Sequence, residues 1–309
     1  GDGIDLPGVN VETDLNKIPL PDNNVNLEQV ELKPSTEPML HEGLHTEEDF
    51  QRIRDKKAAG EEPWVSAYQL LVESQFSQKT ADTYPTEWIK RGISGDENYM
   101  NAARGATIVY QQALRWKIEQ DDEYAAKAVE NLNKWVQTCV GVTGNTNLSL
   151  AAGLYGYEFA IAGELLRDYG GWDRADFAAF QNWLLKVFYP ANDDFLKRHH
   201  DTNALHYWAN WCLCNIAAKM AIGIVTDRRD IYNEGIDHLQ TGDTNGRLRR
   251  AIYHDYAPDY NFAQWQESGR DQGHTLMCVG LMGIICQLAW SQGDDFFAYD
   301  DNLFLRACE

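Results

Sequence analysis

Residues 275–290 read "TLMCVGLMGIICQLAW", a run in which apolar side chains cover most of the circumference of a helix. Residues 206–225 form a second run of the same character. A helix at a protein surface keeps one polar face, so a helix that is apolar all round is expected to be covered on most sides. The two runs therefore predict the inner helices of a double layer, as in an (α/α) toroid.

Amphipathic segments surround these two runs. From about residue 46, apolar residues recur at the spacing i, i+3, i+4 and i+7 in one segment after another, with short linkers between them. The first segment starts at Thr46, where "TEEDF" combines a helix-capping residue with acidic residues in the first turn. Short linkers favour antiparallel pairs of helices. We predict an all-α fold, an (α/α) toroid or barrel of antiparallel helical hairpins, with a β-hairpin expected nowhere except in the N-terminal residues.

The two ends of the chain differ from this helical pattern. Residues 1–45 are rich in Asp, Asn and Pro and have little periodicity, which is typical of an extended arm or linker. Residues 46–309 form the predicted toroid domain, and its last residues, "DDNLFLRACE", read as a helix that would continue past Glu309. The sequence has no initiator Met, so we expect a leader removed upstream and an exported protein, periplasmic or a surface lipoprotein.

The bulk composition excludes some classes of partner. The chain has 309 residues and a formal net charge of −20, which makes nucleic acid and anionic membranes poor partners. No apolar run reads as long enough to span a bilayer, and we expect a monomer. The six cysteines lack matched CxxC pairs and are expected to be buried free thiols. Adjacent histidines such as His199 and His200 point in different directions, so no metal is expected.

Three polar stretches interrupt the apolar pattern and are candidates for chemistry. In "NALHYWAN", a helical spacing would place Asn203, His206 and Asn210 on one face, as a stripe of amides and an imidazole. Tyr207 and Trp208 supply aromatic rings that could stack on a sugar. The alternative is a helix N-terminus with a few satisfied buried polar groups.

The second stretch, "NGRLRRAIYHDYAPDY", begins at residue 245 and gathers arginines in an acidic chain. Arg249 is followed by His254 and Tyr256. An arginine near a phenol favours the phenolate and lowers the pKa of the tyrosine, which makes it a usable base near neutral pH. The alternative is a helix whose arginines form a solvated face.

The third stretch, "QWQESGRDQGHT" at residues 264–275, precedes the long apolar run. Gln266, Arg270 and His274 could point into a cleft and bind an anionic ligand. In the alternative, Glu267 and Arg270 form a structural ion pair and the following Asp caps the next helix.

The run "QWQESGRDQGHTLMCVGLMGIICQLAWSQGDDFFAYDDN" resembles the signature of the alginate lyase-like toroid superfamily of polysaccharide lyases. Members carry a Glu-x-Gly-Arg-Asp-x-x-His segment, an apolar helix, and then an Ala-Trp, a Gly-Asp and an Asn. Weaker similarity extends the resemblance over roughly residues 45–309. Within the superfamily the chain looks closest to polysaccharide lyase family 38.

A more distant similarity links the chain to the family 5 alginate lyases. Their Asn-Asn-His-Ser-Tyr-Trp-Ala stretch aligns with residues 203–209, but the second Asn and the catalytic His fall on Ala204 and Leu205. Their Arg and Tyr, seven residues apart, align with Arg249 and Tyr256. The resemblance implies that Tyr256 is the base and acid and that Arg249 is its helper.

The resemblance also implies the remaining roles. His206, Asn210 and His254 would join the catalytic group, and the substrate would be bound by Asn203, Tyr207, Trp208, Gln266, Glu267, Arg270 and His274. The implied reaction is β-elimination on a uronic-acid polymer, a mannuronate-rich alginate, without a cofactor. Alternatives are a glucuronan lyase, a toroid glycoside hydrolase that would need an acidic pair, and a non-catalytic glycan-binding protein.

Overall fold

The structure is a computed structural model that describes residues 32–309, so most of the predicted arm, residues 1–31, lies outside the described residues. Its helices are α1 (Glu47–Ala58), α2 (Trp64–Glu73), α3 (Tyr99–Glu119), α4 (Asp122–Thr138), α5 (Leu148–Leu166), α6 (Arg174–Val187), α7 (Tyr189–Arg198), α8 (Ala209–Val225), α9 (Arg229–Thr241), α10 (Leu248–Ala251), α11 (Gln272–Ser291) and α12 (Tyr299–Cys308). Shorter elements are the strands β1 (Trp88–Arg91), β2 (Gly141–Gly144), β3 (Ile252–Asp255) and β4 (Ala263–Trp265), and the 3-10 turns η2 (Gln75–Ser77), η3 (His199–Asp201) and η4 (Gln266–Gly269). The predicted all-α class is confirmed.

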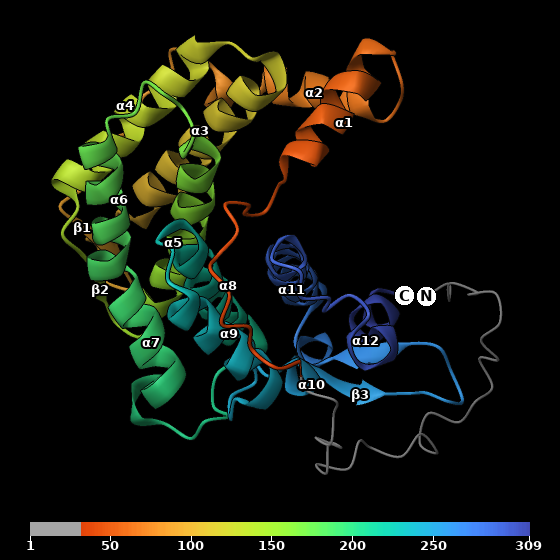
Figure 1. Cartoon of the computed structure of the whole chain (residues 1–309). Coiled ribbons are helices and arrows are strands. Elements are labelled where there is room, and N and C mark those ends of the chain that lie inside the picture. Colours follow the sequence, from red (N-terminus) through yellow and green to blue (C-terminus); the bar gives the residue numbers. More distant parts are fainter. Residues whose placement is uncertain (1–31) are drawn as a thin grey trace, which may run out of the picture.

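The helices form a curved double layer (Figure 1). Helices α3, α5 and α8 follow one another along its inner side, and α4, α6 and α7 lie outside them. Helix α3 packs on α4 and α5, α5 packs on α8, and α8 packs on both α9 and α11. The close approach of α5 to α8 depends on Gly153, because a Cβ there would lie 2.9 Å from the backbone carbon of Cys214.

The two apolar runs have different surroundings. Every residue of α8 is buried except Trp211, which is half-buried, so the prediction of a covered inner helix is confirmed there. Helix α11 buries one face against α8, but Leu276 and Trp290 on its other side are 60% and 54% exposed. The prediction that α11 is covered on most sides is therefore wrong for the chain as described. The apolar pattern of α11 did not reveal how many neighbours it would have.

Helix α11 also corrects the expectation about bilayer-length runs. Among residues 32–309, it is the one helix that is long and apolar enough to cross a membrane by length and composition. Core helices pass the same test, and 39% of its apolar window is buried inside the structure.

Two small sheets depart from the predicted pattern. Strands β1 and β2 pair in parallel. Strands β3 and β4 form an antiparallel hairpin in the middle of the second and third polar stretches, so the expectation that hairpins are confined to the N-terminal residues is wrong. The helix expected around the arginines is the single turn α10, which ends at Ala251. The following "IYHDY" supplies β-branched and aromatic residues, which favour a strand.

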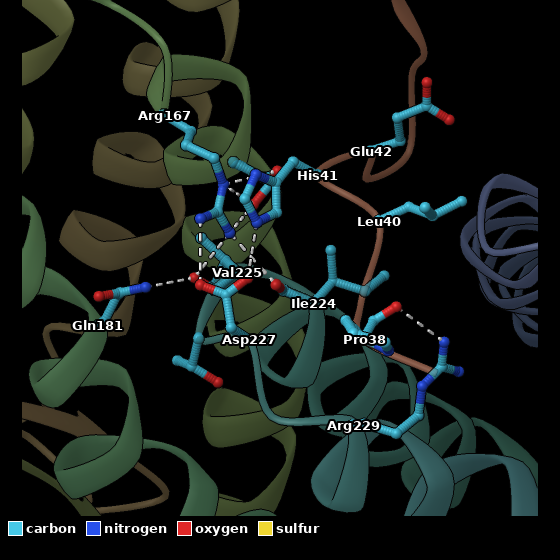
Figure 2. Close-up of polar contacts among 12 residues, drawn as sticks. Pro38, Leu40, His41, Glu42, Arg167, Gln181, Ile224, Val225, Asp227 and Arg229 are labelled. Atoms are coloured by element: carbon cyan, nitrogen blue, oxygen red, sulfur yellow. Dashed lines mark hydrogen bonds and ion pairs between the residues drawn. The ribbon is translucent and has the colours of Figure 1, made fainter. Parts of the chain in front are cut away.

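The described part of the arm, residues 32–45, is an extended strap that leads to α1. It is held by side chains from distant elements: the Gln292 amide binds both the N–H and the carbonyl of Leu40, at 2.8 and 3.0 Å. Arg229 Nε donates to the Glu37 carbonyl at 2.7 Å. Its Nη2 atom also reaches the Pro38 carbonyl at 3.5 Å (Figure 2). Thr46 then caps α1, as the sequence predicted, and Asp49 completes a capping box with it.

All six cysteines of the chain lie among the described residues, and none of them forms a disulfide there. Five are buried and Cys308 is exposed. Burial raises the pKa of the Cys212 thiol to about 11, so this thiol stays neutral at physiological pH. The prediction of buried free thiols is confirmed for all but Cys308.

Helix α5 carries a carboxyl group that makes stability depend on pH. Burial raises the pKa of Glu158 to about 7, and its Oε2 atom has no hydrogen-bond partner among the described residues. Because the folded chain holds this proton more tightly than the unfolded chain, the contribution of Glu158 is favourable at low pH and is lost as the pH rises toward 7. We expect Glu158→Gln to gain up to about 3 kcal/mol relative to the natural chain between pH 5 and pH 8.

Urea unfolding of both proteins at each pH measures this difference. The exposed Glu48→Gln serves as a matched control and should show no such trend. A Glu158→Gln difference that stays constant across the range would contradict the assignment.

Candidate functional site

The second and third polar stretches are brought together by the β3–β4 hairpin. The Tyr256 hydroxyl donates to Gln264 Oε1 at 2.8 Å across the hairpin. Gln264 Nε2 in turn donates to Ser268 Oγ in η4 at 2.9 Å. The phenol predicted to be the base is therefore connected by two hydrogen bonds to the turn that precedes α11.

The same turn is joined to the first stretch at the N-terminus of α8, which has no side-chain cap of its own. Gln266 Oε1 accepts from the Ala209 N–H at 2.9 Å. Glu267 Oε1 accepts from the Asn210 N–H at 2.9 Å and from the Asn210 side-chain amide. Glu267 is fully buried. Both acceptors satisfy amides that a helix start leaves open, so their role in this geometry is to hold α8 against η4.

This arrangement predicts a stability effect. Glu267→Ala removes the acceptor for two N–H groups of Asn210 in a buried position, and we expect a loss of roughly 1–3 kcal/mol in the free energy of unfolding. Glu267→Gln keeps an acceptor oxygen and should lose less. The exposed Gln272→Ala is the matched control. Thermal denaturation checks the order; equal stability of the Glu267→Ala and Gln272→Ala proteins would contradict the capping role.

Two further side chains of the third stretch differ in their surroundings: Arg270 is exposed, and the His274 imidazole is paired with a carboxylate. The Arg270 guanidinium lies over the Trp208 ring at 5.4 Å, and both side chains are exposed. His274 Nδ1 pairs with Asp271 Oδ2 at 2.6 Å, while Asp271 Oδ1 accepts from the His274 N–H. Asp271 is thus the cap of α11, as the structural alternative expected, but no Glu267–Arg270 ion pair is found among the described residues. Arg270 remains available to an anionic ligand.

The predicted stripe of Asn203, His206 and Asn210 on one helix face is wrong. Helix α8 begins at Ala209, so Asn203 and His206 lie in the preceding loop and are exposed, whereas Asn210 is buried. The Asn203 side chain accepts from the Leu205 N–H at 2.9 Å. Such a local bond competes with helix formation, which explains why the stretch starts as a turn.

An aromatic cluster surrounds Tyr207 in this loop. Its ring lies 4.9 Å from the His206 ring, 4.8 Å from Trp211 and 5.8 Å from His200, measured between centroids. His200 Nε2 is 2.9 Å from Ser149 Oγ at the start of α5. His200 belongs to η3, where three consecutive residues have positive φ, an uncommon conformation for residues other than glycine.

Sequence reasoning did not single out His200 for this position, because a histidine beside another histidine carries no spacing signal. It also missed Arg91 of β1, whose guanidinium lies 4.5 Å from the Tyr99 ring and 3.5 Å from the Tyr155 hydroxyl. Glycines and polar residues just after Arg91 line an open groove together with Asn145 and Asn147. None of the predicted site residues lines this groove. These groups are neighbours only through folding.

Arg249 was predicted to help Tyr256, but the structure pairs its guanidinium with two carboxylates instead. Its guanidinium binds Asp255 Oδ2 at 3.2 Å and forms an ion pair with Asp300. Asp255 also accepts from Arg306 Nη2 at 2.9 Å. Burial alone would raise the pKa of Asp255, but its bonds to Arg306 and the charge of Arg249 lower it to about 2. Arg249 therefore ties the hairpin to α12.

The environment of Tyr256 corrects the expectation of a lowered pKa. Burial, assisted by Tyr253, raises the pKa of the Tyr256 phenol. Asp255, the last residue of β3, binds the arginines, whereas Tyr256 follows the strand and its hydroxyl binds Gln264. The His254 ring meets the Tyr256 ring edge-on at 4.3 Å. His254 is thus the imidazole in contact with the ring of this phenol.

Solved structures with the same fold are alginate lyases. Alginate lyase A1-III from Sphingomonas species A1 has a TM-score of 0.58 and 13% identity over 85% of this chain and 75% of that chain. The histidine-to-alanine variant of A1-III complexed with tetrasaccharide has a TM-score of 0.61 and 13% identity, covering 82% and 71%. An alginate lyase from Bacteroides ovatus has a TM-score of 0.54 and 14% identity, covering 82% and 77%. The likeness confirms the predicted (α/α) toroid.

The sequence itself is similar to a family model. No curated protein matches it in a direct search. The model described as alginate lyase matches residues 53–309, which include every helix from α2 onward and every predicted site residue. The chain therefore belongs to the alginate lyase family and is a polysaccharide lyase.

Proposed function

We propose that this chain cleaves mannuronate-rich alginate by β-elimination, with Tyr256 as both base and acid. The observation that carries the proposal is the setting of the phenol: Tyr256 is half-buried, its hydroxyl is held by Gln264, and the His254 ring is in contact with it. The hydrogen bonds through Gln264 and η4 connect it to a turn that ends at the exposed Arg270.

The reaction requires the carboxylate of the uronate to be neutralised, because this makes the C5 proton acidic enough to be removed. We assign this role to Arg270, with the exposed Asn203 amide as a second donor. Asn210 was predicted to join the catalytic group, but its amide is occupied by the buried Glu267, so we assign it to holding the start of α8.

The proton movements balance with the groups at hand. His254 accepts the phenol proton, and the Tyr256 phenolate removes the proton from C5. The electron pair left at C5 forms the C4–C5 double bond as the C4–O bond to the neighbouring sugar breaks. The departing oxygen takes a proton from the reprotonated tyrosine, so that one side chain acts as base and then as acid. A residue with a raised pKa suits the acid step.

Two similar solved structures support a role for tyrosine and histidine in chemistry rather than in binding. Two of the similar structures are A1-III variants, one with a histidine and one with a tyrosine replaced, and both are complexed with tetrasaccharide. Those variants bind a sugar chain without the replaced group. We propose that Tyr256 and the histidines near it likewise act in the chemical step rather than in binding the sugar chain.

Ultraviolet absorbance of the unsaturated product tests the proposal directly. Polymannuronate, polyguluronate and glucuronan are offered separately, and reducing ends are counted in parallel. We expect absorbance to rise fastest with polymannuronate. A preference for polyguluronate or glucuronan would overturn the substrate assignment, new reducing ends without absorbance would indicate hydrolysis, and binding without either signal would indicate a glycan-binding protein.

A further inference from the structure

A row of aromatic rings extends from Tyr256 into solvent along the loop of the β3–β4 hairpin. The Tyr256 and Phe262 rings lie 4.9 Å apart, and the Phe262 and Tyr260 rings lie 5.4 Å apart, with 31° between the latter two planes. Phe262 is 39% exposed and Tyr260 is 54% exposed. The row therefore starts at the proposed base and ends at the surface.

The backbone of the loop holds this row in place. The Tyr256 N–H donates to the Phe262 carbonyl at 3.2 Å, and the Tyr260 N–H donates to the Tyr256 carbonyl at 3.0 Å. These bonds fix the positions from which the outer two rings project. Large exposed rings that sit side by side on an ordered loop mark a surface used for contact, since isolated exposed side chains need no such support.

We propose that Tyr260 and Phe262 form a platform that binds a pyranose ring of the alginate chain next to the sugars at Tyr256. One face of a pyranose presents C–H groups with a slight positive charge, and the face of an aromatic ring is negative, so the two attract and shed water when they stack. This occupant is favoured over a second protein because the platform is continuous with the ring of Tyr256. The inference rests on the proposed function.

The charges around the platform suit stacking on a sugar ring, while the sugar carboxylate is bound elsewhere. The rings carry no charge and their exposed neighbour Asp259 is an acidic residue, so the platform offers no cation to a carboxylate. The exposed cation Arg270 lies at the other end of the connection through Gln264 and Ser268. Stacking therefore adds affinity for a polyanion in a chain whose net charge is −20, where electrostatic attraction over the whole molecule is unfavourable.

Tyr260→Ala tests the platform without touching Tyr256, because the ring of Tyr260 contacts Phe262. We expect KM for polymannuronate to rise roughly fivefold with kcat unchanged, and Tyr260→Phe to behave as the natural chain. The effect should disappear with oligosaccharides too short to reach beyond the cleaved bond. It should also persist when salt is raised, because stacking is not screened.

The control is Tyr84→Ala, an exposed tyrosine (74%) that belongs to none of the contacts described above. If Tyr260→Ala leaves KM equal to that of Tyr84→Ala, or lowers kcat alone, the platform is overturned. Equal loss with short and long substrates would overturn it as well.

A binding measurement separates this inference from the proposed reaction. Retardation of each protein in a gel containing polymannuronate is compared in a Tyr256→Phe background, where the ring is kept and the hydroxyl is removed. Weaker retardation of the Tyr260→Ala protein supports the platform even if the natural chain forms no unsaturated product, an outcome that defeats the proposed function alone. Equal retardation with and without the Tyr260 ring overturns the platform.

Discussion

Tyr256→Phe is expected to lower kcat on alginate by roughly 10²–10⁴-fold, because it removes the atom that we assign to both proton transfers. The ring itself stays in contact with His254 and Phe262. The hydroxyl contributes one hydrogen bond, to Gln264, so stability should change by only about 1 kcal/mol. Product absorbance measures kcat, and retardation in a polymannuronate gel should show that binding is retained.

Tyr253→Phe is the matched control, since Tyr253 is a half-buried tyrosine in β3, three residues before Tyr256. It should keep nearly full activity. If Tyr256→Phe retains the natural rate while His254→Ala abolishes it, the base is the imidazole and the assignment of Tyr256 is wrong. A pH profile of kcat/KM with His254→Gln then shows whether the imidazole contributes a titrating group.

Arg167→Ala is expected to destabilise the fold by about 3–5 kcal/mol, because it leaves a buried carboxylate without its cation. The Arg167 guanidinium binds both oxygens of Glu164, with Nη2 at 2.9 Å from Oε2, and reaches Asp227 at 3.2 Å. It also donates to the carbonyls of Ile224 and Val225 at the end of α8. Figure 2 shows this guanidinium between α5 and the α8–α9 turn, beside His41 of the strap.

The loss should depend on pH in a defined direction. Burial raises the pKa of Glu164 to about 7, even though Arg167 acts to lower it, and removing Arg167 raises this pKa further. The folded variant can then take up a proton when the pH falls, so the destabilisation should be smaller at pH 5 than at pH 8. Urea unfolding at both pH values measures it.

Arg228→Ala is the control, because Arg228 makes an ion pair with Asp230 at the surface and should cost at most about 1 kcal/mol. The double variant Arg167→Met with Glu164→Gln should recover part of the loss, since the buried charge is then gone. A loss for Arg167→Ala no larger than that for Arg228→Ala would contradict a structural role for the buried pair.

Periodicity and local capping were sufficient for the helices whose signals lie within the helix itself. Thr46 caps α1 as predicted, and α8 is as fully buried as its apolar circumference indicated. The Glu-x-Gly-Arg-Asp-x-x-His segment, with the apolar helix after it, was enough to point to the family that the family model then matched. These properties depend on residues a few positions apart, and such spacing can be read directly.

Other properties depended on partners far away in the chain. Glu267 binds Asn210 at the start of α8, 57 positions away. Arg249 is paired with Asp300 and His200 contacts Ser149, each 51 positions away. No local pattern distinguishes an arginine that helps a tyrosine from one that ties down an aspartate. The ion pairs of Asp255 with Arg249 and Arg306 at the end of β3 decided that question, and β3 is a strand only through its pairing with β4.

By itself, then, the sequence determined an all-α toroid of the alginate lyase family and the stretches in which its polar chemistry is gathered, because helix periodicity and the family segment are local. Only the tertiary structure decided which of those polar groups are free and which are occupied. It buried Asn210 and Glu267 against each other, left Arg270 exposed over Trp208, and placed Tyr256 at the start of a row of rings. The physical reason is that burial and pairing are properties of the space around a side chain, and that space is filled by residues from distant parts of the chain.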